Sequence, residues 1–320
     1  MNNKCKAALI AAGVFTAAFT ISSAVINRKI TEIAISRRPP SIYEKAGEIF
    51  QSKFMKDCDL AMLKEFSDAL QAKPTKDVEI INRDGMRLAG HLYEAEHPKR
   101  IILAMHGWRS SWSFDFGAIS DYLHDTDSSV LYAEQRGQNA SDGEYMGFGV
   151  LERYDCLDWL QYIRDEISAE LPVYLAGISM GATTVLMASG LGLPDYVHGI
   201  IADCGFTSPK AIWTHIVRNE LHLTEKLIYP TAKRICSDEA HFDSESVSTV
   251  EAMKVNKTPV LFVHGLDDRF VPVAMTVENY AYCTAPKDIF IVPGAGHGAS
   301  FLRDPDGYKQ KTEAFFAAFD

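Results

Sequence analysis

The chain has few cysteines, and no two of them form a Cys-x-x-Cys pair. Its 320 residues contain six, at positions 5, 58, 156, 204, 236 and 283. Metal-finger spacing is therefore absent. The first cysteine precedes an apolar stretch, and the other five are an odd number, which argues against a complete disulfide framework. We expect buried free thiols, which suits a reducing compartment.

The chain also lacks an excess of positive charge. It has 32 Lys and Arg against 42 Asp and Glu, for a net charge of −10. A basic nucleic-acid footprint is thus missing, and we expect no nucleic-acid partner. Internal repeats are absent, while 47% of the residues are hydrophobic. That composition suits one large domain or two small ones with ample apolar surface for a core.

A long uncharged run stands near the N-terminus. Residues 7–26 carry no charge, and basic residues flank both ends. Twenty apolar residues in a helix cover the hydrocarbon core of a bilayer, so residues 1–30 are predicted to be a single membrane anchor. A cleaved signal peptide is the alternative, because Ser22 to Ala24 offer small residues, and the product would then be secreted. A buried core helix fits the charged flanks least, and the basic residues at both ends leave the sidedness open.

Residues 31–75 are predicted to be a helical linker. Two prolines at 39 and 40 stop any preceding helix, and Ser41 with Glu44 forms a potential capping box. Apolar residues then recur at helical spacing up to about Leu70. This apolar face either packs on the following domain, lies on a membrane or borders a substrate cleft.

Residues 76–320 alternate strand-like and helix-like stretches. The predicted strands are 78–82, 88–93, 101–105, 130–133, 173–177, 199–203, 259–264 and 289–292. The predicted helices are 113–124, 151–167, 179–189, 273–283 and 306–319. This pattern indicates an α/β fold, with a mostly parallel eight-stranded sheet, helices on both faces and an antiparallel hairpin at its start. Residues 205–257 form a long, helical, cap-like excursion between two strands.

A serine stands between one of these strands and the helix that follows it. The sequence Gly177-Ile178-Ser179-Met180-Gly181 matches a sharp strand-to-helix turn with its central residue in strained geometry. Glycines on either side remove Cβ atoms that would collide. The turn predicts that Ser179 is exposed at a helix N-terminus, where developing negative charge is favoured.

An acidic residue and a histidine follow two later strands. Asp267 and Asp268 come after 259–264, and His297 comes after 289–292. Loops at the carboxyl ends of parallel strands meet at one edge of the sheet. The order serine, aspartate, histidine is the one in which α/β-hydrolases carry a catalytic triad.

These features resemble the α/β-hydrolase superfamily, and within it the bacterial serine aminopeptidase-like and acyl-ester hydrolases. The resemblance covers residues 76–320 and includes 135–137 and 141–145, which parallel a family loop. Glu134, Gln138 and Asn139 depart from that loop's usual Asp, His and Gly, at positions that are not catalytic in the family. The family pattern His-Gly-x-x-Asp-x-x-Val-Pro implies that Asp268, rather than Asp267, is the acid.

The resemblance implies a nucleophile at Ser179, a base at His297 and an orienting acid at Asp268. The backbone N–H groups of Trp108 and Met180 are expected to form the oxyanion hole. We expect a substrate pocket lined by Trp108, Phe206 and Trp213, and neither a metal nor a cofactor.

The predicted function is hydrolysis of a small-molecule or lipid-like carboxylic ester through an acyl-enzyme. A serine peptidase, a thioesterase or an acyltransferase shares that step and stays open. A non-catalytic, membrane-anchored binding protein is the alternative from another class, because a fold alone does not determine function.

Overall fold

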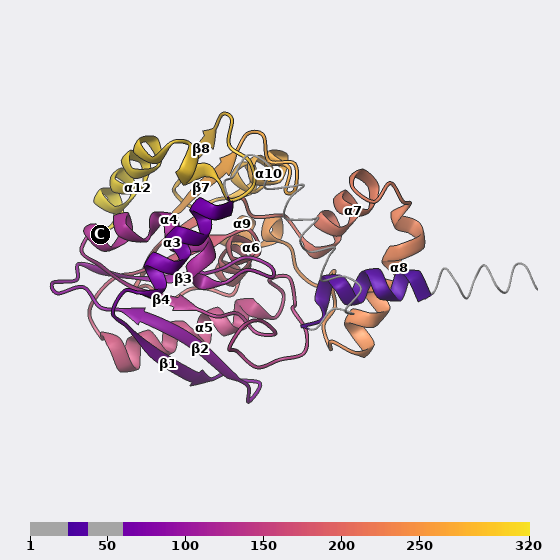
Figure 1. The fold of residues 1–320 in the computed structure, drawn as a ribbon, viewed down its shortest axis with the longest axis horizontal. Coiled ribbons are helices and arrows are strands. Elements are labelled where there is room, and N and C mark those ends of the chain that lie inside the picture. Colours follow the sequence, from indigo (N-terminus) through magenta and orange to yellow (C-terminus); the bar gives the residue numbers. More distant parts are fainter. Residues whose placement is uncertain (1–24, 38–59) are drawn as a thin grey trace, which may run out of the picture.

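A computed structural model describes residues 25–37 and 60–320 (Figure 1). In this part of the chain, eight strands form one sheet in the order β1-β2-β4-β3-β5-β6-β7-β8. Strands β1, β2 and β4 pair antiparallel, and the remaining neighbours pair parallel. The strands are β1 Thr75–Ile81, β2 Arg87–Tyr93, β3 Arg100–Met105, β4 Ser128–Ala133, β5 Val173–Ile178, β6 Val197–Asp203, β7 Val260–Gly265 and β8 Lys287–Val292.

Helices connect most of these strands. They are α3 Leu60–Gln71, α4 Trp112–Asp125, α5 Glu152–Tyr162 with its π-helical continuation η2 Ile163–Ile167, α6 Met180–Ser189, α7 Pro209–Asn219, α8 Glu225–Asp238, α9 Thr249–Val255, α10 Val273–Tyr282, α11 Ser300–Arg303 and α12 Pro305–Phe319. Residues 25–35 form one more helix.

The central strands are apolar on both faces because helices cover both. Along β3, Leu103 belongs to a core cluster that includes side chains of α5, α6 and α9, while its neighbours Ile102 and Ala104 face α3, α4 and α12. Successive side chains of a strand point to opposite faces, so one continuous apolar run fills both cores. The predicted α/β-hydrolase fold, with its mostly parallel eight-stranded sheet between helices, is confirmed.

Helix α3 shows where part of the predicted linker lies. Its buried residues Leu63, Ser67 and Leu70 recur on one side of the helix. That side packs on α4, where Ser67 Oγ lies 2.9 Å from Ser113 Oγ. A Cβ at Gly117 of α4 would lie 2.7 Å from the Phe66 carbonyl carbon, so a glycine there permits the close approach of the two helices.

Helices α7, α8 and α9 occupy the excursion between β6 and β7. In Figure 1, α7 and α8 stand to one side of the sheet, beside the helix of residues 25–35. The contact with this helix is direct, because Arg28 forms an ion pair with Glu239 at 2.7 Å and Asn27 Nδ2 donates to the Leu227 carbonyl at 2.6 Å. Residues 25–37 are called the strap below.

Residues 1–24 of the predicted membrane anchor, 1–30, lie outside the described residues, as does the capping box at 41–44. In the described ranges, no helix combines the length and apolar character that crossing a bilayer requires. The four cysteines in these ranges, Cys156, Cys204, Cys236 and Cys283, are free and buried.

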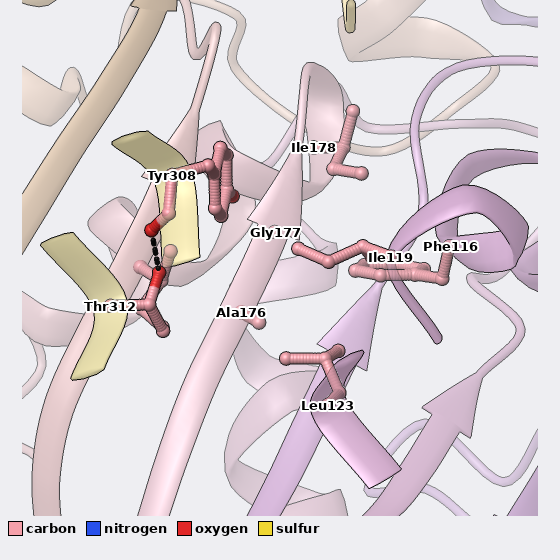
Figure 2. Close-up of a pocket in the computed structure, with 9 residues that line it drawn as sticks. Phe116, Ile119, Leu123, Ala176, Gly177, Ile178, Tyr308 and Thr312 are labelled. Carbon is pink, nitrogen blue, oxygen red and sulfur yellow. Dashed lines mark hydrogen bonds between the residues drawn. The ribbon is translucent and has the colours of Figure 1, made fainter. Parts of the chain in front are cut away.

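A small apolar cavity lies between α4, β5 and α12 (Figure 2). It measures about 20 Å³ and is lined by Phe116, Ile119, Leu123, Ala176, Gly177, Ile178, Ile201, Tyr308 and Thr312. Such a volume is close to that of a single water, and an apolar lining leaves a cavity of this size dry. The core next to Gly177 and Ile178, which precede Ser179, is therefore closely packed except for this small cavity.

Truncating Leu123 is expected to destabilise the fold. The side chain is 3% exposed and borders this cavity. Leu123→Ala enlarges the cavity and removes buried methyl groups, so the free energy of unfolding is expected to fall by about 2–5 kcal/mol. Unfolding in urea measures this change in the free energy of unfolding. Leu227→Ala is the matched control, because that leucine is 68% exposed. Equal unfolding free energies for the two variants would contradict the expectation.

Candidate active site

The turn that carries Ser179 is strained in the way its sequence predicts. Strand β5 ends at Ile178, α6 begins at Met180, and Ser179 between them has φ 57° and ψ −116°. A Cβ at Gly181 would lie 1.9 Å from the Met105 carbonyl oxygen, and one at Gly177 would lie 2.4 Å from Gly181. No side chain fits at either position, so the two glycines make the turn possible.

Three predicted residues from three separate loops form one chain of hydrogen bonds. His297 Nε2 lies 2.9 Å from Ser179 Oγ, and His297 Nδ1 lies 2.7 Å from Asp268 Oδ2. The other oxygen of Asp268 accepts the backbone N–H groups of Phe270 and Val271, at 2.8 and 2.9 Å. The Asp268 side chain has no exposed surface. This carboxylate is thus oriented by its own loop toward the imidazole.

The two ionisable partners shift each other's pKa. Burial raises the pKa of Asp268, but the facing imidazoles of His297 and His264 outweigh burial and hold that pKa well below its ordinary value. Burial likewise opposes a charged His297, yet the Asp268 carboxylate outweighs it and raises the pKa of His297 well above its ordinary value. The arrangement therefore stabilises an imidazolium next to the serine oxygen, as a general base requires after it takes a proton.

The loop after β3 lies against the nucleophile turn. A Cβ placed on Gly107 would come within 3.3 Å of Ser179 Cβ. Asp115 of α4 holds this loop from below, accepting the Gly107 N–H at 2.6 Å and the Ser110 hydroxyl at 2.5 Å. Trp108 follows Gly107 directly, and Met180 is the first residue of α6, where N–H groups have no partner within the helix. Both predicted oxyanion residues thus lie next to Ser179 in the chain or in space.

The three departures from the family loop support the Trp108 loop. Gln138 Oε1 accepts the Arg109 N–H at 2.5 Å. Asn139 Nδ2 donates to the Ser110 carbonyl at 2.8 Å and to Glu134 Oε2 at 2.6 Å. From the sequence, these positions were expected to affect only the shape of their own loop. In the structure, their side chains form hydrogen bonds that support the loop of the candidate oxyanion hole.

The predicted pocket residues meet around an aromatic ring that sequence reasoning missed. The Phe148 ring centroid lies 6.3 Å from that of Trp108, 5.9 Å from that of Phe206 and 5.0 Å from that of Trp213. All four belong to one apolar cluster together with Met180. The available signal was Phe148 itself, an aromatic residue between two glycines with its φ at 53°.

His264 and Cys204 lie beside the hydrogen-bonded chain. His264 Nε2 is 3.2 Å from Asp268 Oδ2 and 2.9 Å from the Val271 carbonyl oxygen, so it braces the acidic loop. In the described ranges, one group of side chains has metal-ligand geometry: Cys204, Asp268 and His297, whose ligand atoms lie within 4.8 Å of one another. Two of these three already bond each other, and burial raises the pKa of the Cys204 thiol to about 11, which disfavours the thiolate that binds metal.

The chain is similar to known hydrolases. A sequence model of the prolyl oligopeptidase family (Peptidase_S9) matches residues 112–319. An uncharacterised protein of Bacillus subtilis (strain 168), YqkD, is 25% identical over 197 residues, which are 61% of this chain and 65% of that protein. The match thus spans less than two thirds of this relative's length.

Solved structures share the fold at low sequence identity. The Pyrococcus furiosus esterase Pf2001 aligns with a TM-score of 0.65 and 19% identity, covering 80% of this chain and 93% of that one. The acylaminoacyl peptidase of Pyrococcus horikoshii aligns with a TM-score of 0.56 and 17% identity, covering 78% of this chain and 42% of that one.

Proposed function

The chain belongs to the prolyl oligopeptidase family of serine hydrolases, and we propose that it cleaves carboxylic esters with a triad of Ser179, His297 and Asp268. The observation that carries the proposal is the continuous bonding from serine oxygen to imidazole to buried carboxylate, at 2.9 and 2.7 Å. A serine hydroxyl is unreactive at neutral pH and needs a base in hydrogen-bond contact to become a nucleophile.

The reaction proceeds through an acyl-enzyme. Ser179 Oγ attacks the ester carbonyl carbon while its proton passes to His297 Nε2, and Asp268 stabilises the imidazolium through Nδ1–H. The N–H groups of Trp108 and Met180 receive the oxyanion. His297 then protonates the leaving alcohol. It next takes a proton from water, which attacks the acyl carbon, and gives that proton to Ser179 Oγ as the bond to the acyl group breaks and the acid is released.

We propose that an apolar acyl group is bound by the apolar side chains that cluster with Met180, the residue after Ser179. The side chains of Phe148, Phe206 and Trp213 gather beside Met180 in one buried cluster. Pockets that bind small molecules are mostly lined in this way, with a few polar groups that orient the ligand. We therefore propose a small-molecule or lipid-like ester as the substrate. A serine peptidase is the second candidate, because the family model that matches the chain bears the name of a peptidase family.

A fluorophosphonate probe tests whether Ser179 is a nucleophile. The folded protein is expected to take up one probe per chain on the peptide that contains Ser179, because the probe mimics the tetrahedral intermediate and needs an activated serine. Mass spectrometry locates the label, and heat-denatured protein is the control. Folded protein that stays unlabelled would favour the non-catalytic binding protein instead. Ester and peptide substrates assayed side by side on unlabelled enzyme from the same preparation separate the two hydrolase candidates.

A further inference from the structure

The strap joins the catalytic domain by backbone pairing. Ser36 forms an antiparallel bridge with Tyr145, and the Met146 N–H donates to the Ile35 carbonyl at 2.7 Å. Only Gly147 separates Met146 from Phe148, whose ring contacts three other aromatic rings of the apolar cluster. The strap is thus attached to the segment that leads directly into the candidate acyl pocket.

The same strap binds the candidate oxyanion loop. Trp108 Nε1 donates to the Ala34 carbonyl at 2.7 Å. Arg109 Nη2 donates to the carbonyls of Ile33 and Ser36, at 2.7 and 2.5 Å. The carbonyls of Ile33, Ala34 and Ser36 therefore bind the side chains of two consecutive residues in the loop after β3.

Arg109 needs this support because its backbone is strained. Its φ is 53°, a left-handed conformation that is unfavourable for a residue other than glycine and persists only where neighbours impose it. Its N–H is held by Gln138 Oε1, its guanidinium lies over the Trp108 ring at 5.2 Å, and burial lowers its pKa to about 10. The orientation of the peptide group between Trp108 and Arg109 is consequently determined by two sets of contacts. Gln138 binds the Arg109 N–H, and the strap carbonyls bind the Arg109 guanidinium.

Ile35 contributes a side chain as well as a carbonyl. It has no exposed surface and belongs to the cluster that contains Phe148, Met180, Phe206 and Trp213. A β-branched residue in that position fills part of the interior of this cluster.

We infer that residues 33–36, the C-terminal part of the strap, belong to the active site. Arg109, gripped by strap carbonyls, is a positioning residue for the Trp108 N–H of the oxyanion hole, and Ile35 is a specificity-determining wall of the acyl pocket. The inference rests on the proposed ester hydrolysis at Ser179.

Arg109→Met in the full-length chain tests the positioning role. The change removes all three guanidinium hydrogen bonds to the strap carbonyls while keeping much of the side-chain volume. With p-nitrophenyl esters, kcat is expected to fall by about 10- to 100-fold while KM changes by less than about threefold, because a displaced oxyanion donor is felt in the transition state. Arg109→Lys retains a single charged donor and is expected to recover part of kcat. Arg28→Met is the matched control, since Arg28 bonds the strap to Glu239 of the cap, away from the loop, and kcat should be unchanged.

Ile35→Ala tests the pocket wall with a different readout. Removing the buried branches makes room within the apolar cluster that contains Met180, so kcat/KM for long acyl chains relative to acetate is expected to rise by roughly tenfold. A series of p-nitrophenyl esters from acetate to decanoate measures this ratio. It does not depend on the amount of folded enzyme, so it stays informative where a variant is less stable.

The outcomes separate the inference from the proposed function. A wild type that takes the fluorophosphonate label, with a lowered kcat in Arg109→Met and a shifted ester profile in Ile35→Ala, supports the inference. A labelled wild type with both variants behaving like Arg28→Met overturns the inference and leaves the triad standing. A wild type without label or turnover overturns both.

Discussion

Ser179→Ala is expected to lower kcat for p-nitrophenyl esters by about 10⁶-fold, because the variant has no atom that can form the acyl-enzyme. The fold is expected to persist. The lost hydroxyl bonds His297 at 2.9 Å, and alanine has the same Cβ as serine, so the strain of the turn is unchanged. Turnover is measured with enough enzyme to detect the residual rate, and thermal unfolding is followed in parallel.

Ser237→Ala is the matched control for that experiment. Ser237 is an exposed serine of α8, and the same chemical change there should leave kcat within about twofold, as surface substitutions away from functional features do. A Ser179→Ala enzyme that retained a tenth of wild-type turnover would refute the nucleophile assignment.

Asp268→Asn is expected to lower kcat by about 10⁴-fold, while Asp267→Asn leaves it nearly unchanged. An amide at 268 can donate to His297 Nδ1, which favours the imidazole tautomer that cannot accept the serine proton. Asp267 is exposed, and its N–H bonds the Ala295 carbonyl at 3.0 Å. The pair of variants changes adjacent carboxylates identically, so a large loss in Asp267→Asn with none in Asp268→Asn would reverse the assignment.

Asp268→Asn is also expected to shift the pH dependence of kcat/KM. The base must be neutral to act, so kcat/KM falls as pH drops through the pKa of His297. In the wild type the Asp268 carboxylate raises this pKa above its ordinary value against the effect of burial. Without that carboxylate the pKa is lower, and the acid limb of the residual activity shifts to lower pH. A shift to higher pH would contradict the electrostatic role given to Asp268.

Much of the fold followed from patterns that are local in the chain. The apolar run of β3 predicted a strand buried on both faces, and two core clusters cover it. The Ser179 turn was predictable because its two glycines meet a steric demand set within five residues. The leading hairpin and the helices between most of the later strands followed from the same alternation of pattern.

Other features of the site depend on contacts that no local pattern contains. Phe148 was missed because an aromatic residue between glycines is compatible with many loop conformations, and its role appears only where Trp108, Phe206 and Trp213 surround it. Residues from 31 onward were expected to form a linker, yet Ala34 bonds Trp108 across 74 positions of the chain. Helical periodicity reveals that a face is apolar but not which distant surface covers it.

The sequence by itself determined the sheet, the strained serine turn and the order of serine, acid and histidine, because steric limits and hydrophobic alternation act between near neighbours. Only the tertiary structure decided which side chains converge on Ser179 and that residues 33–36 grip the loop beside it. Those contacts join segments far apart in the chain, and their geometry is set by the packing of the whole domain.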